Sequence, residues 1–141
     1  MRKRRGMVLI LCLMVLTTVF SSLLVNATDD KIDYSFTIDG WRCNGREEAG
    51  RYRQTTHTDN PWKVKMESSK EGDNTYTNYW LEKYDETNVS IKRQVKVGLG
   101  PYYTDAKSGA SQTTVYLTAE NNNFNGTSYK VSGFWDEETW D

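Results

Sequence analysis

The acidic side chains near the C-terminal end are the residues of this chain best suited to acid–base chemistry. Hydrolysis of a glycosidic bond uses two carboxyl groups at a fixed separation, and Glu120 with the run Asp136, Glu137 and Glu138 could provide them. The chain has 19 acidic residues, however, so such groupings arise by chance, and a run of three acids is typical of a solvated end that discourages edge-to-edge strand pairing. We therefore predict no catalytic residues. A carboxylate-dependent glycan hydrolase and calcium binding by these acids are the alternatives.

The single histidine is the other candidate for chemistry, because nucleophilic catalysis generally needs a base. Paired with Cys43, His57 would form a cysteine dyad, yet it lies in the polar stretch 55–60, which is typical of a solvated turn. Tetrahedral zinc needs four nitrogen or sulfur ligands, and the chain has one histidine and two cysteines. We expect neither a metal nor a cofactor.

Aromatic side chains point to binding rather than catalysis. Rings that protrude from loops supply a large contact area at small entropic cost, so they can stack on sugars or anchor protein interfaces. Four rings in apparent loops or near the terminus are the predicted ligand or interaction residues: Trp41, Tyr102, Tyr103 and Trp140. Three rings within apolar strands are predicted to fill the core: Trp62, Trp80 and Trp135.

Alternation of apolar and polar residues indicates the elements that must position these rings. Along 62–67, Trp62, Val64 and Met66 point to one side and three charged residues to the other, which predicts one buried and one wet face. The other candidate strands are 34–38, 51–55, 76–84, 89–91 continuing at 95–97, 113–120 and 128–135. About seven short strands separated by polar turns predict an all-β fold, an antiparallel β-sandwich.

The pair Asn125 and Gly126 is the best local turn signal. A type I′ turn needs positive φ at both central positions, which Asn and Gly tolerate. The pair lies between two of the clearest strands. We therefore predict a hairpin formed by residues 113–120 and 128–135.

The first 27 residues predict an export signal. Four basic residues at positions 2–5 precede an apolar run from Met7 to Val25, and Val25 and Ala27 offer the small side chains that a signal peptidase inspects. The predicted organisation is a cleavable signal helix over 1–27 and a single β-sandwich domain over 28–141, in a secreted, extracellular protein. A retained membrane anchor is the alternative, because about 20 apolar residues can span a bilayer.

Cleavage would change both the cysteine content and the charge. It removes Cys12 and leaves Cys43 as a buried small hydrophobe, an intermolecular bridge or a reactive thiol. The mature chain would hold 14 basic and 19 acidic residues, a formal charge of −5. Because duplex-binding proteins need a cationic face, we expect no nucleic-acid partner. We expect membrane contact only through the signal segment before cleavage.

Several stretches resemble a family of small exported proteins of Gram-positive bacteria that is catalogued as a domain of unknown function. The resembling stretches are 50–55, 60–64, 79–81, 115–123 and 131–139. This resemblance implies an export signal and a β-rich domain, with no established activity. A more distant likeness, carried by Val131, Gly133 and Trp135, is to the lactococcin-type bacteriocins, which are secreted β-sheet polypeptides.

The favoured prediction is a non-enzymatic extracellular binding or interaction protein whose partner is a protein or a cell-envelope component. One alternative is a secreted, bacteriocin-like antagonist that acts on the envelope of competing bacteria. The carboxylate-dependent glycan hydrolase is the second alternative.

Overall fold

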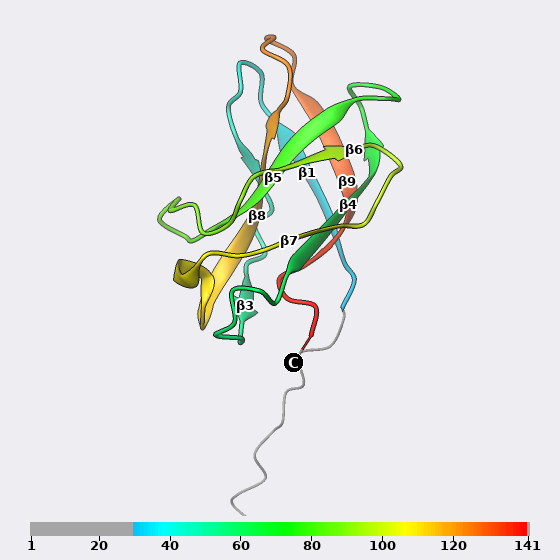
Figure 1. Ribbon diagram of the computed structural model, residues 1–141. Coiled ribbons are helices and arrows are strands. Elements are labelled where there is room, and N and C mark those ends of the chain that lie inside the picture. Colours follow the sequence, from blue (N-terminus) through cyan, green and yellow to red (C-terminus); the bar gives the residue numbers. More distant parts are fainter. Residues whose placement is uncertain (1–29, 141) are drawn as a thin grey trace, which may run out of the picture.

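The computed structural model describes residues 30–140, which form two antiparallel β-sheets packed face to face (Figure 1). One sheet has the strand order β1-β9-β4-β7, and the other has the order β2-β8-β5-β6 with β3 also paired to β8. The strands are β1 (Ile32–Ile38), β2 (Gly45–Arg46), β3 (Arg51–Arg53), β4 (Trp62–Ser69), β5 (Tyr76–Glu82), β6 (Arg93–Lys96), β7 (Tyr102–Thr104), β8 (Thr113–Asn121) and β9 (Tyr129–Asp136). The predicted all-β sandwich is confirmed.

Helical structure within residues 30–140 is limited to one 3-10 turn, η1 (Ser108–Ala110). No helix in this part of the chain is long and apolar enough to cross a membrane. The predicted signal segment, residues 1–27, lies outside the described residues.

The core lies between the two sheets and follows the alternation of each strand. β1 contributes Tyr34, Phe36 and Ile38, and β8 faces them from the other sheet with Val115 and Leu117. All five side chains are at most 9% exposed. Burial of such apolar area stabilises the fold by roughly 25 cal/mol per Å², so the period-two pattern fixes which face of each strand is inside.

All three tryptophans predicted to be core residues are buried, and two of them lie between the sheets. Trp62 and Trp135 are fully buried between the sheets. Trp80 is 1% exposed but lies on the outer face of β5, opposite in direction to its neighbours Tyr79 and Leu81. Its ring is covered by the Lys92 ammonium, 4.0 Å from the ring centroid. The prediction that Trp80 is buried is therefore confirmed, although its ring lies outside the cluster between the two sheets.

The predicted hairpin of residues 113–120 and 128–135 is wrong. β8 pairs with β5, β2 and β3, whereas β9 lies between β1 and β4 in the other sheet. Each of these strands is hydrogen-bonded to another strand on both sides, so neither has a free side on which to pair with the other. Neither Asn125 nor Gly126 has a positive φ, and residues 122–128 cross from one sheet to the other instead of closing a tight turn (Figure 1).

Loops gather at the two ends of the sandwich. At one end, which we call the apical end, the connection 39–44 between β1 and β2 meets the connection 122–128 between β8 and β9 (Figure 1). At the opposite, basal end, the last residues of β9 meet β3 and the start of β4. The residues predicted to be functional are divided between these ends: Trp41 lies at the apical end, and Trp140 and Asp136 lie at the basal end.

Candidate functional site

The four aromatic residues predicted to bind a ligand lie at three separate places. Trp41 is at the apical end and is 62% exposed, and Trp140 is at the basal end and is 42% exposed. Tyr102 and Tyr103 lie on β7, an edge strand of the four-stranded sheet. The fold therefore does not unite the four rings in a single surface.

Of the three rings outside the apical end, two have local structural contacts. Tyr102 is half-buried against the core, and the Arg93 guanidinium lies 4.9 Å from its ring centroid. Tyr103 points outward and is 52% exposed. The Trp140 ring lies 5.7 Å from the ring of His57. The side chain of His57 is 66% exposed, as expected of a residue in a solvated turn.

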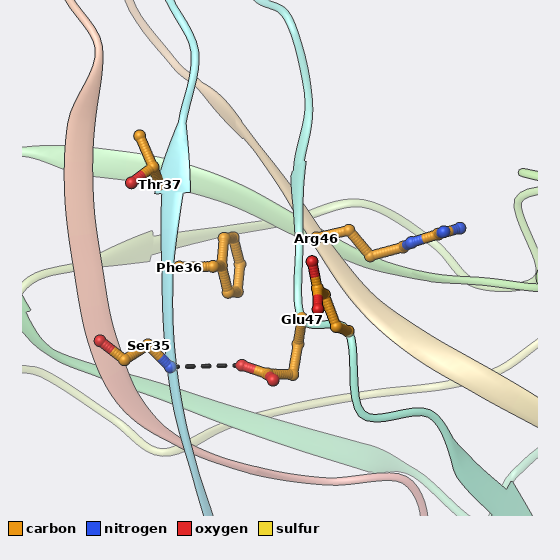
Figure 2. Close-up of a pocket in the computed structure, with 6 residues that line it drawn as sticks. Ser35, Phe36, Thr37, Arg46 and Glu47 are labelled. Carbon is orange, nitrogen blue, oxygen red and sulfur yellow. Dashed lines mark hydrogen bonds between the residues drawn. The ribbon is translucent and has the colours of Figure 1, made fainter.

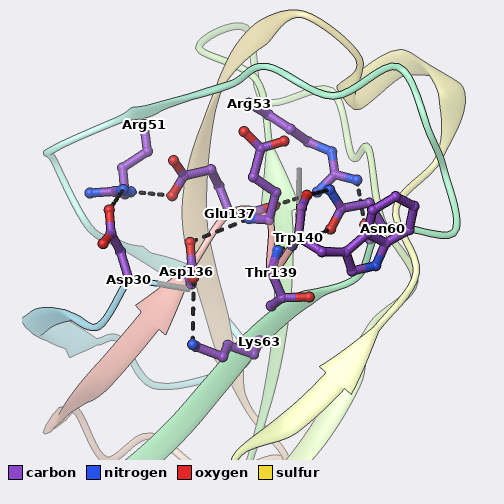
Figure 3. Close-up of polar contacts among 10 residues, drawn as sticks. Asp30, Arg51, Arg53, Asn60, Lys63, Asp136, Glu137, Thr139 and Trp140 are labelled. Atoms are coloured by element: carbon purple, nitrogen blue, oxygen red, sulfur yellow. Dashed lines mark hydrogen bonds and ion pairs between the residues drawn. The ribbon is translucent and has the colours of Figure 1, made fainter. Parts of the chain in front are cut away.

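Asp136 and Lys63 form a buried ion pair at the basal end (Figure 3). Lys63 Nζ lies 3.5 Å from Asp136 Oδ2, and each side chain is 1% exposed. Burial and then the Glu137 carboxylate raise the pKa of Asp136 to about 7, against the opposing effects of the Glu138 backbone N–H and the Lys63 ammonium. The predicted wet face of 62–67 was wrong at Lys63, which lies between Asp136 of β9 and Tyr103 of β7.

The rest of the acidic run is also buried and engaged. Glu137 accepts a charge-assisted hydrogen bond from Arg51 Nε, and the two oxygens of Glu138 accept from the backbone N–H groups of Gln54 (2.9 Å) and Thr55 (2.8 Å). Arg53 is 1% exposed and donates to the backbone carbonyls at positions 57, 60 and 137. The predicted solvated end is therefore wrong, because these partners replace water.

Asn60 fastens the chain beyond β9. Its Oδ1 accepts from the backbone N–H groups of Thr139 (3.0 Å) and Trp140 (3.2 Å), and its Nδ2 donates to the Trp140 carbonyl (Figure 3). We call the whole set the basal lock: Arg51, Arg53, Asn60, Lys63 and residues 136–140. Its carboxylates hold the end of the chain against β3 and β4.

Glu120, the fourth carboxylate singled out for hydrolysis, lies apart from the basal lock. It is on the outer face of β8, where Lys92 Nζ lies 3.0 Å from Glu120 Oε1. Within residues 30–140, no three His, Cys, Asp or Glu side chains are grouped so that they could hold a metal ion. Cys43 is exposed in the apical loop, so its interpretation as a buried small hydrophobe is wrong.

The turn at the apical end presents two large side chains from strained backbone. Trp41 and Arg42 have φ of 61° and 60°, and the Cys43 N–H donates to the Gly40 carbonyl (3.2 Å), the pattern of a type I′ turn. Such turns favour Asn and Gly, because positive φ costs other residues about 1 kcal/mol or more each. Here the two strained positions hold Trp and Arg.

The loop 122–128 holds Trp41 in place. The Trp41 N–H donates to the Asn125 carbonyl (2.6 Å), and a Cβ added to Gly126 would lie 3.0 Å from three adjacent indole atoms, so the ring packs directly on this glycine. The Phe124 ring contacts Trp41 edge-on with centroids 5.3 Å apart. Phe124 is 68% exposed, and the Arg42 guanidinium lies 5.9 Å from its centroid. We call Trp41, Arg42 and Phe124 the apical tip.

An open groove of about 420 Å³ runs between β1 and the segment that includes β2 (Figure 2). It is lined by Ser35, Phe36, Thr37, Arg46, Glu47 and Glu48. Glu47 Oε2 accepts a hydrogen bond from the Ser35 N–H (3.3 Å). A carboxylate at this point covers a backbone donor on the open edge of β1, which discourages pairing with another strand.

A comparison with protein families places all but the last of the described residues in one of them. The model of the family described as "Protein of unknown function (DUF2712)" matches residues 18–139. The chain belongs to the DUF2712 family. No curated protein and no solved structure is significantly similar to it. Family membership therefore supplies no activity, and the function of this DUF2712 chain must be argued from its geometry.

Sequence reasoning selected Trp41 but missed Arg42 and Phe124. Arg42 carries no local signal in the sequence, because arginine is not a residue type that positive φ favours. A usable signal for Phe124 existed, since it is a lone apolar ring in the polar stretch 121–128. In this DUF2712 chain, pairing of the two apical loops brings these residues together.

Proposed function

We propose that the protein is exported and acts outside the cell as a non-enzymatic binding protein, with the apical tip as its contact surface. The observation that carries this proposal is the turn that holds Trp41 and Arg42 at positive φ while Trp41 stays 62% exposed. Backbone strain is a reason to suspect function when the strained side chains do not serve the core.

The geometry of the tip suits binding because the tip is organised before any partner arrives. A ring fixed against Gly126 and Phe124 loses little conformational freedom on contact. Exposed aromatic and arginine side chains are also the types that dominate binding energy at interfaces.

A binding role also agrees with the state of the carboxylates. Glu137 and Glu138 are occupied by partners in the basal lock, and Asp136 is paired with Lys63. These groups have a structural role that accounts for their burial. The proposed partner is a protein or a component of the cell envelope, as the sequence suggested.

The test is retention on insoluble cell wall. The full chain is expressed with its own leader, and the purified product is sedimented with cell walls from a panel of bacteria. We expect co-sedimentation that is lost in Trp41→Ala and kept in Tyr103→Ala, a matched control because Tyr103 is equally aromatic, 52% exposed and remote from the tip.

Two readouts of this experiment would count against the proposal. Equal retention of the wild type and Trp41→Ala would show that the apical tip is not the contact surface. The intact mass of the purified product reports whether residues 1–27 have been removed, and an uncleaved cytoplasmic product would contradict export.

A further inference from the structure

We infer that the apical tip binds an anionic saccharide, with a sugar ring stacked on Trp41 and its carboxylate or phosphate paired with Arg42. This inference rests on the proposed function and adds the chemical class of the ligand. It follows from three features of the tip: the exposed indole surface, the guanidinium that has no carboxylate partner within residues 30–140, and the polar rim.

The indole of Trp41 forms a fixed platform. Gly126 and Phe124 contact part of the ring, and the side chain is nevertheless 62% exposed. The face of a sugar ring presents C–H groups that are apolar and slightly positive, and these groups are attracted to the negative face of an aromatic ring. A flat, immobile and solvent-facing indole therefore matches a pyranose.

Arg42 supplies the charge. It is exposed, it contacts the Phe124 ring, and within residues 30–140 it has no carboxylate partner. A planar guanidinium binds carboxylate and phosphate oxygens in a bidentate manner. The acidity of the chain as a whole does not prevent this contact, because at physiological salt charges beyond about 8 Å are largely screened.

The rim of the tip favours a saccharide over a lipid surface. Two residues adjacent to the tip in the sequence carry an exposed amide or hydroxyl, namely Asn44 and Thr127, whereas the exposed Asn123 amide already donates to the Glu71 carboxylate (3.0 Å). Such groups can exchange hydrogen bonds with sugar hydroxyls, whereas insertion into a bilayer would strip them of water without replacement partners. The tip also lacks the cluster of several basic residues that attracts proteins to anionic membranes.

The experiment compares matched charged and neutral sugars. The ¹⁵N-labelled protein is titrated with oligogalacturonate and with its neutral methyl ester, and separately with N-acetylglucosamine 1-phosphate and with N-acetylglucosamine. The indole N–H signal of Trp41, assigned by its absence in Trp41→Ala, is followed by NMR. We expect a charged member to shift this signal and to bind about tenfold more tightly than its neutral match, because a charge-assisted hydrogen bond contributes at least this much.

Two variants separate the platform from the charge. Trp41→Ala lacks the indole signal and is followed instead through the backbone N–H signal of Gly126, which lies against the indole in the wild type; it should show no binding. Arg42→Gly should make the charged and neutral members bind equally weakly. Arg42→Gly is expected to fold, since glycine is free at positive φ. Glu86→Gly is the matched control, because Glu86 is an exposed residue with φ of 65° in the loop after β5.

The outcomes are distinguishable. Preference for oligogalacturonate or for the sugar phosphate identifies a carboxylate or a phosphate as the anionic group. If none of the four sugars shifts the signal, or if neutral members bind as tightly as charged ones, the inference is overturned. In that case the proposed function would still be supported if the wild type sediments with cell wall and Trp41→Ala does not. If the two proteins sediment equally, the proposed function and this inference are both overturned.

Discussion

At the scale of one residue, Arg42 occupies a backbone position where glycine would give a more stable protein. The positive φ of Arg42 disfavours any side chain with a Cβ, and no core contact of Arg42 compensates for it. Natural proteins keep such residues where binding needs them, at some loss of stability. We therefore expect that Arg42 can be replaced without loss of the fold.

Arg42→Gly is expected to raise the free energy of unfolding by about 0.5–1 kcal/mol. Relief of the left-handed strain exceeds the entropy that glycine adds to the unfolded chain and the weak contact with Phe124. Chemical denaturation measures the change, and Glu86→Gly should give a gain of similar size. A loss of stability in Arg42→Gly would show that the guanidinium is needed for the fold, and would contradict its assignment to binding.

Asp136 predicts a pH dependence at the basal lock. Its pKa is raised in the folded state to about 7 from an ordinary value of 3.8, so folded Asp136 binds its proton more tightly than the unfolded chain does. Its contribution to stability is therefore fully present below about pH 4 and is lost as the pH rises through 7. The size of this loss is on the order of 2 kcal/mol or more.

The measurement is urea denaturation at pH 5 and pH 8 of the wild type and of Asp136→Asn. The variant cannot titrate at this position, so the decline in the free energy of unfolding from pH 5 to pH 8 should be smaller in Asp136→Asn. Glu48→Gln, at an exposed carboxylate of the groove, is the control and should follow the wild type. An identical decline in Asp136→Asn and the wild type would assign the pH dependence to other groups.

At the scale of elements, alternation predicted strands well and their neighbours poorly. Period-two patterns located most of β1, β4, β5, β8 and β9, because each of these strands buries one apolar face. Alternation contains no information on which strands pair, so the hairpin of 113–120 with 128–135 was wrong. The burial of Lys63 was equally invisible, because its partner Asp136 lies 73 positions further along the chain.

The basal lock could not be predicted for the same reason. It joins β3, the start of β4 and the end of β9, and each of its charged residues looks solvated within its own segment. The apical tip could be predicted in part, because the sequence alone identifies Trp41 as an aromatic residue in a loop. Phe124 joins it only through contacts between two loops far apart in sequence.

Removal of Asn60 tests how the lock holds the end of the chain. In Asn60→Ala, the backbone N–H groups of Thr139 and Trp140 lose their acceptor, so we expect a loss of about 1–3 kcal/mol in the free energy of unfolding. The last residues should also be released faster by carboxypeptidase under native conditions. Asn44→Ala, in the exposed apical loop, is the control, and equal digestion of the two variants would contradict the role given to Asn60.

At the scale of the whole molecule, two hydrogen bonds cross the core between the sheets. The hydroxyls of Tyr34 in β1 and Tyr79 in β5 are hydrogen-bonded at 2.9 Å, and the hydroxyls of Thr77 and Tyr129 are 3.0 Å apart. Burial raises the pKa of both Tyr34 and Tyr79 above the ordinary value, so this pair stays neutral. These bonds fix how the two sheets face one another in a domain whose single described cysteine is free.

The second partner of Tyr34 predicts unequal effects of removing either hydroxyl. Tyr34→Phe leaves the fully buried Tyr79 hydroxyl without its partner, which should cost about 1–3 kcal/mol. In Tyr79→Phe, the Tyr34 hydroxyl can still donate to the Lys65 carbonyl at 3.3 Å, so a loss of about 1 kcal/mol or less is expected. Thermal and urea denaturation of the two variants measure the difference. Since both changes remove one oxygen atom from the same interface, equal losses would mean that the Lys65 carbonyl does not replace Tyr79 as the partner of the Tyr34 hydroxyl.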